Sequence, residues 1–149
     1  MKNFHFILFF SLLNLQLIFS QSNPVQWSFS SNELSDGMYE LVFTADVQEG
    51  WSIYSQHTDP SGPIPTAFYF DNNSNIELLD KPSEAGKKKE GYDELFGVNV
   101  IKFAGKVTFI QKIKMIEPTK NVVGYLEYMC CDEEKCLPPK EVAFTIPLP

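Results

Sequence analysis

The sequence predicts an all-β protein, a single immunoglobulin-like sandwich of two antiparallel sheets, and three observations lead to this prediction. Apolar residues alternate with polar residues along most of the chain, turn sequences separate the alternating segments, and no long segment keeps a helical stripe. Alternation with a period of two is typical of strands that bury one face. Many short strands with regular turns and no helices pack as two sheets, face to face.

The first 20 residues have a different character. Lys2 is followed by a largely apolar run, and no acidic residue precedes Glu33. This pattern is typical of a secretory signal peptide. Polar residues interrupt the apolar run, whereas an uncleaved membrane helix needs roughly 20 apolar residues. We therefore expect cleavage near residues 20–22, no stable membrane insertion afterwards, and an exported domain at residues 23–149 in a compartment where disulfides persist.

The strands of this domain follow one another in short segments. We expect nine of them, at residues 25–29, 39–47, 51–54, 67–70, 76–79, 98–103, 107–115, 122–129 and 142–148. Turn residues lie between many of them, at 35–37, 49–50, 59–63, 71–73 and 104–105. Residues 82–97 carry no strand pattern and are rich in Lys, Glu and Gly. They are expected to form a mobile surface loop.

The charge of the chain excludes some classes of partner. The formal net charge is −7, and the chain contains no Arg. A negative field without guanidinium groups is a poor match for a polyanion, so nucleic acid is not expected as a partner. The lysines at 87–89 are the only basic run, and we interpret them as a solvated loop rather than a binding patch.

The three cysteines, Cys130, Cys131 and Cys136, lie within seven positions. A disulfide across so short a loop contributes roughly 2 kcal/mol by loop entropy, against nearly 5 kcal/mol for a loop of about 100 residues. Such a bridge contributes little stability, which favours a chemical role over a structural one. Three thiols cannot all pair within one chain, so one remains free.

The cysteines lie where the strand at 122–129 ends and the chain turns back. Pro138 and Pro139 remove two backbone donors and fix the turn. Alternation sends Cys130 and Cys131 to opposite faces, so one of them is expected to be buried and inert. The spacing leaves open which of them pairs with Cys136.

The acidic residues at 132–134 are expected to raise the pKa of nearby thiols, since negative charge disfavours the thiolate. Such a dithiol attacks slowly and exchanges chiefly with a matched partner.

Two other functions fit the same residues. A binding module would use the disulfide only to shape the hairpin. A copper(I) site would use the soft ligands Met129 and the three cysteines. Zinc fits less well, because it wants four ligands and His57 is distant in the sequence. The preferred interpretation of the cysteines is a redox-active disulfide, with the copper(I) site as an alternative. On the preferred interpretation we expect no metal and no further cofactor.

Three segments follow one another in an order typical of a known family: EGWSIY at 49–54, DELFG at 93–97 and YMCCDEEKCLPP at 128–139. On these segments the chain resembles the N-terminal periplasmic domains of the thiol:disulfide interchange protein DsbD. The last segment is the specific one. The resemblance covers nearly all of the expected mature domain.

The resemblance implies an immunoglobulin-like periplasmic domain that relays electrons through Cys131 and Cys136. Cys131 holds the family position three residues after Tyr128, so Cys130 is an extra cysteine. The electrons would come from a membrane electron-conduit protein and thioredoxin-like proteins, supplied in trans because this chain ends at residue 149. They would pass to a periplasmic disulfide isomerase or a cytochrome c maturation protein. Independently of the resemblance, Cys136 is expected to form the first mixed disulfide, because the two prolines at 138–139 leave its flank open.

The resemblance also implies a cap over the cysteines, formed in the family by a loop with an aromatic tip. Asp93 and Glu94 begin the matching segment. Leu95 stands where an aromatic is familiar, so the cap is expected to rely on Phe96. Tyr54 matches a tyrosine near the cysteines, whereas Ser52 stands where a second tyrosine is familiar.

Overall fold

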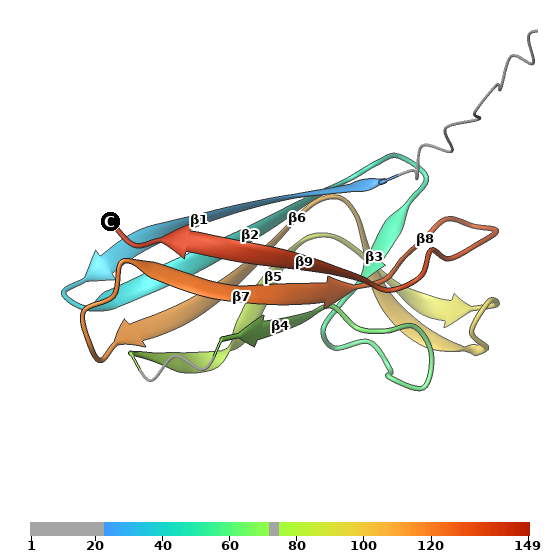
Figure 1. Cartoon of the computed structure of the whole chain (residues 1–149). Helices are drawn as coiled ribbons and strands as arrows, with labels where there is room; N and C mark the ends of the chain where they lie inside the picture. The colour runs from blue at the N-terminus through green and yellow to red at the C-terminus, as the bar shows by residue number, and fades with distance from the viewer. Residues whose placement is uncertain (1–22, 72–74) are drawn as a thin grey trace, which may run out of the picture.

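The computed structural model describes residues 23–71 and 75–149, which form two antiparallel sheets packed face to face (Figure 1). The strands are β1 (Val25–Ser35), β2 (Met38–Val47), β3 (Ser52–Tyr54), β4 (Ala67–Phe70), β5 (Ile76–Asp93), β6 (Val98–Met115), β7 (Asn121–Tyr128), β8 (Cys130–Cys131) and β9 (Lys140–Pro147). The larger sheet has the order β1-β2-β6-β3-β8, with β5 also paired to β6, and the smaller has the order β4-β7-β9. The predicted all-β, immunoglobulin-like sandwich is confirmed.

Two of the predicted segments lie wholly or mostly outside the described residues. The signal peptide and its cleavage site at 20–22, and most of the turn at 71–73, lie outside the described residues. Within the described ranges, no helix is long and apolar enough to cross a membrane.

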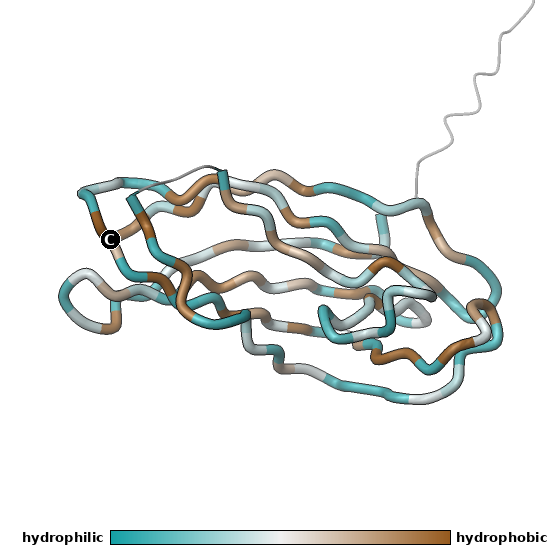
Figure 2. The backbone as a smooth tube through the Cα atoms, turned by 90° about the horizontal axis from the view of Figure 1, so that it is seen from below, coloured by the Kyte–Doolittle hydropathy of each residue, from teal (hydrophilic) through white to brown (hydrophobic). Residues whose placement is uncertain are grey.

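The core lies between the sheets and is rich in aromatic side chains. Along β2, every second residue from Tyr39 to Val47 is buried, and Figure 2 shows the same alternation of hydrophobic and hydrophilic positions along the strands. Phe43 is fully buried, with its ring centroid 4.6–6.4 Å from four other rings: Phe29, Phe68, Phe70 and Phe144. These contacts join the two sheets, because Phe43 belongs to the larger sheet and three of its partners lie on β4 and β9.

The prediction of a mobile loop at 82–97 is wrong. Residues up to Asp93 extend β5 to 18 residues, paired antiparallel with β6, and only the following four residues form a turn. β5 pairs on one side only and most of its side chains are exposed. An edge strand of this kind needs no apolar alternation, and lysines on it discourage pairing with other chains. The pattern that indicated a loop is therefore also the pattern of an exposed edge.

The strands predicted at 98–103 and 107–115 are one strand, β6, and the turn predicted at 104–105 is an irregularity within it. Gly105 has a φ of 67°, and the register against β5 shifts between Gly86 and Lys87. On its other side, β6 pairs with β3 through Lys102 and Phe103, and with β2 through residues 106–114. This division places β3 and β8 at one end of the sandwich, beside the turn between β5 and β6 (Figure 1).

Gly124 on β7 tests how tightly the sheets pack. A Cβ at this position would lie 2.1 Å from the Tyr69 carbonyl oxygen and 2.8 Å from Cζ of Phe144. We expect Gly124→Ala to lower the free energy of unfolding by about 3 kcal/mol, since overpacking forces backbone to move. Urea denaturation measures this loss. Gly91→Ala is the control, because a Cβ there meets nothing within 4 Å; equal losses in the two variants would contradict the steric explanation.

Candidate functional site

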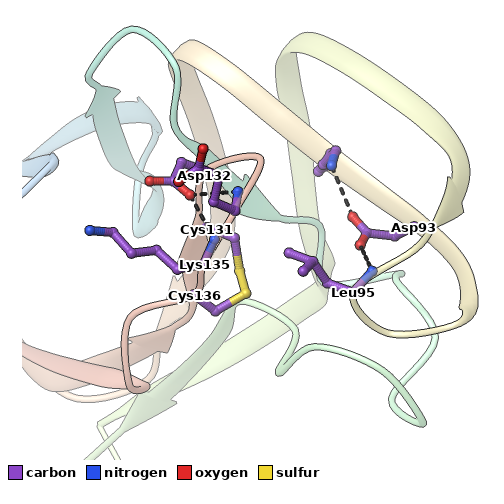
Figure 3. The surroundings of a disulfide bond; sticks show 8 residues. Asp93, Leu95, Cys131, Asp132, Lys135 and Cys136 are labelled. Atoms are coloured by element: carbon purple, nitrogen blue, oxygen red, sulfur yellow. Dashed lines mark hydrogen bonds and ion pairs between the residues drawn. A yellow bond between two sulfur atoms is a disulfide. The ribbon is translucent and has the colours of Figure 1, made fainter.

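A disulfide joins Cys131, in β8, to Cys136 across a short acidic hairpin. The Asp132 carboxylate accepts hydrogen bonds from the backbone N–H groups of Glu134 (2.9 Å) and Lys135 (2.7 Å), which lower the pKa of Asp132. The Asp132 N–H donates to the Lys135 carbonyl at 2.9 Å. Hydrogen bonds to the side chain and the backbone of Asp132 therefore fix the hairpin between the two cysteines (Figure 3).

Cys130 and Cys131 pack into different clusters, as the alternation predicted. Cys130 belongs to the main core, together with Ile53 and Tyr128. Its thiol is free, and burial raises its pKa, so it is a poor nucleophile at neutral pH. Cys131 is also buried, at 3% exposed, but in a separate cluster with Tyr54 and Val100.

The cluster around Cys131 includes two residues outside the sequence motifs, Val98 and Val100. Phe96, Val98, Met129 and Cys136 pack against it and are partly buried. Val98 and Val100 alternate at the start of β6, and this alternation is the sequence pattern that indicates their shared face. The disulfide therefore lies in a small apolar cluster outside the main core.

The turn at 93–97 lies over this cluster and is held by Asp93. The Asp93 carboxylate is 2.9 Å from Nζ of Lys102 and accepts a hydrogen bond from the Leu95 N–H at 3.1 Å. The Gly97 N–H donates to the Asp93 carbonyl at 2.8 Å. Asp93 is 7% exposed, whereas Glu94 is exposed and has no such role in the turn.

The two apolar residues of the turn take different positions. Leu95, 48% exposed, points toward the disulfide (Figure 3). Phe96 packs edge-on against the ring of Tyr54, with centroids 5.9 Å apart. Leu95 therefore faces the sulfur atoms, and Phe96 supports the cluster beneath.

The two tyrosines also lie in different places. Tyr54 is fully buried beside Cys131, and burial, followed by the charge of Asp93, raises its pKa. Its hydroxyl has no hydrogen-bond partner among the described residues. Tyr128 lies in the main core against Trp27, at 5.5 Å between rings, and burial raises its pKa to about 12. Only Tyr54 is in the cluster that holds the disulfide.

Of the four ligands considered for copper, Met129, Cys131 and Cys136 lie in one cluster and Cys130 lies outside it, in the main core. Cys131 and Cys136 are joined as a disulfide. In the ranges that the structure describes, no three His, Cys, Asp or Glu side chains are grouped as metal ligands.

The sequence matches the family model described as thiol:disulfide interchange protein DsbD, N-terminal, over residues 21–147. Comparison with curated proteins gives no match.

Several solved structures are similar, among them the three that follow. The Neisseria meningitidis DsbD N-terminal domain in the reduced form has a TM-score of 0.54 and 18% identity, covering 81% of this chain and 84% of that chain. The N-terminal periplasmic domain of ScsB from Proteus mirabilis has a TM-score of 0.56 and 14% identity, covering 81% and 44%. The complex between the DsbD and PilB N-terminal domains from N. meningitidis has a TM-score of 0.52 and 15% identity, covering 81% and 80%. At these identities the similarity shows a shared fold.

Proposed function

This chain belongs to the family of DsbD N-terminal domains, which are thiol–disulfide relay domains, and we propose that it reduces disulfides of partner proteins through Cys131 and Cys136. The observation that carries the proposal is the disulfide itself, which lies at one end of the sandwich and outside the main core. A bridge so placed can open without removing side chains from the core. The turn with Leu95 and Phe96 would act as its cap, with Asp93 fixing the turn and Tyr54 packing beneath it, whereas Glu94 is exposed and Tyr128 packs in the main core.

The relay would run through a mixed disulfide. In the dithiol form, the Cys136 thiolate attacks a sulfur of the partner's disulfide, and the partner's other sulfur leaves as a thiolate. The Cys131 thiolate then attacks Sγ of Cys136, which releases the partner as a dithiol and restores the Cys131–Cys136 disulfide. Two electrons pass to the partner. Cys136 is suited to the first attack, because it is partly exposed whereas Cys131 is buried.

The electrons would return from a thiol donor. A membrane electron-conduit protein or a thioredoxin-like protein would attack the disulfide through its own thiolate, so that two electrons enter and the dithiol forms again. The acceptor would be a periplasmic disulfide isomerase or a cytochrome c maturation protein. In N. meningitidis, a DsbD N-terminal domain forms a complex with the PilB N-terminal domain, which supports a protein as partner.

The proposed compartment is the periplasm. The family match begins at residue 21, immediately after the segment that we interpret as a signal peptide at residues 1–20. Cleavage near residues 20–22 would leave the proposed domain at 23–149 intact. N-terminal sequencing of the exported protein tests this cleavage site.

The experiment that tests this function is a redox titration. The mature domain is equilibrated across thiol/disulfide buffers and trapped by alkylation, and the Cys131–Cys136 state is determined by peptide mass spectrometry. An exchangeable relay is expected to have a midpoint above about −250 mV. A midpoint below about −300 mV is typical of a structural bridge. That result would favour a binding module, in which the disulfide only shapes the hairpin.

Leu95 gives a more local prediction. Leu95→Ala is expected to raise the rate at which glutathione reduces the disulfide by about fivefold, because access of the attacking thiolate helps set exchange rates. Stopped-flow measurement of thiol release gives this rate. Leu34→Ala is the matched control, since Leu34 is 50% exposed and lies on β1. Equal rates in the wild type and Leu95→Ala would show that Leu95 does not shield the sulfur atoms.

A further inference from the structure

A shallow trough of about 390 Å³ lies beside Cys131, on the opposite side of β8 from the main core. The small residues Ser52 and Ala104 line it, together with the larger side chains of Trp51, Lys102 and Phe103. Asp132 and Glu133 of the cysteine hairpin line one side of it. The lysines of β5, at residues 87–89, line the other, so the trough has one acidic and one basic wall.

The strand register explains this arrangement. Ser52 is paired with Cys131, and Lys87 is paired with Ala104. Lys102 is paired with both Tyr54 and Lys89. Residues directly paired across antiparallel strands stand on the same face. Lys87 and Lys89 therefore stand on the face that carries Cys131, on the strand at the far side of the trough.

Two small side chains lie between Cys131 and the lysines of β5. Ser52 contributes a hydroxymethyl group beside Cys131, and Ala104 contributes a methyl group beside Lys87. Because both side chains are small, they leave space between Cys131 and β5.

Lys87 and Lys89 differ from the neighbouring lysines because they form no ion pair with a carboxylate among the described residues. Lys102 pairs with Asp93 at 2.9 Å, and Lys88 pairs with Glu90 at 2.5 Å. On a chain with a net charge of −7, two ammonium groups without an ion pair, three strands away from the disulfide, would attract carboxylates locally. The three lysines at 87–89 lie in strand β5 and not in the expected loop, and their side chains are exposed as expected.

The spacing of the strands sets the length of the ligand. Two strands, β3 and β6, lie between β8 and β5, so Cys131 and Lys87 are separated by three strand spacings, roughly 14 Å between Cα atoms. An extended chain covers this distance in about four residues. A carboxylate that reaches Lys87 or Lys89 would thus lie about four residues from a cysteine at the disulfide.

We propose that this trough binds an extended segment of a partner protein that carries carboxylates about four residues from its reacting cysteine. This inference rests on the proposed function, since it names the kind of partner that exchanges with the same disulfide. Opposite charges across an interface raise association rates and disfavour wrong partners. The lysines would therefore select partners while taking no part in the bond exchange.

The test uses thiol peptides as probes. Two peptides are used to reduce the Cys131–Cys136 disulfide at low ionic strength. The acidic peptide is Ac-Cys-Ser-Gly-Ser-Asp-Asp-NH₂, and the basic peptide has Lys-Lys in place of Asp-Asp. Two further peptides with the reversed sequences test binding in the opposite chain direction. Rates are expressed per thiolate, so that differences in thiol pKa do not enter. We expect the acidic peptide to react about tenfold faster than the basic one in at least one direction, and the preference to vanish in 0.5 M NaCl.

Three variants identify the lysines as the cause. K87Q/K89Q is expected to reduce the ratio of acidic to basic rates to about one, and K87E/K89E to reverse it, as electrostatic steering requires. K112E/K114E is the matched control, because it changes the net charge equally on exposed positions in the half of β6 that pairs with β2. This control is expected to keep the wild-type ratio. Circular dichroism and thermal unfolding verify that each variant folds.

Several results would overturn the proposal. Equal rates for all peptides, or an unchanged ratio in K87E/K89E, would show that the lysines do not select the partner. The same lysine dependence for glutathione, which is too short to span the trough in this way, would identify a site for small thiols instead. The ratio of peptide rates is independent of the midpoint potential, so failure of this proposal is distinguishable from failure of the relay.

Discussion

Cys136→Ser is expected to abolish reduction of partner disulfides and to leave the fold intact. Without the Cys136 thiolate there is no group to form the mixed disulfide, and Cys131 is buried beneath the turn at 93–97. The bridge closes a short loop, so its loss costs only about 2 kcal/mol by loop entropy. The reduced domain is mixed with a disulfide-bonded substrate protein, and dithiol formation in that substrate is followed by alkylation and mass spectrometry.

Cys130→Ala is the control for this experiment. Its thiol lies in the main core and is not part of the disulfide, so exchange is expected to continue at the wild-type rate. Thermal unfolding of both variants distinguishes chemistry from folding. Full exchange activity in Cys136→Ser would rule out the relay as proposed, and an unfolded Cys136→Ser would indicate a structural bridge.

Phe43→Ala is expected to give the largest loss of stability, about 4 kcal/mol, as for other buried aromatic residues truncated to alanine. The Phe43 ring is fully buried and contacts four other aromatic rings across both sheets. Its removal would leave a cavity between the sheets. Guanidinium denaturation of the oxidised domain measures the change in the free energy of unfolding.

Leu34→Ala provides the comparison, since the Leu34 side chain is 50% exposed. A surface change of this kind is expected to alter stability by less than about 0.5 kcal/mol. A loss below about 1 kcal/mol for Phe43→Ala would mean that the core closes around the missing ring.

The sequence predicted the fold well where one face of a strand is buried. Along β2 and β7, burial imposes strict alternation, so both strands were found close to their observed bounds. β5 was missed beyond residue 79 because an exposed edge strand has no buried face to impose the pattern. Its pairing with β6 comes from backbone hydrogen bonds, which leave little trace in residue type.

The candidate site was predictable only where it is local in the chain. The cysteine hairpin lies in one motif, and the alternation of Cys130 and Cys131 correctly placed them on opposite faces. The contact of Phe96 with Tyr54, and the position of Lys87 across from Cys131, depend on strand pairing between distant segments. No single segment contains that information. The signal peptide and the catalytic roles of the cysteines stay predictions.

The division of β6 between two partners has a consequence for local stability. On the side away from β5, its second half is paired with the long strand β2 within the core, whereas its first half is paired only with β3, a strand of three residues that is paired in turn with the two residues of β8. Short elements at the end of a sheet open at a lower free energy than the core strands. The disulfide therefore lies in a subregion that can exchange its amide hydrogens and admit a partner through local fluctuations, while the aromatic centre of the sandwich stays closed.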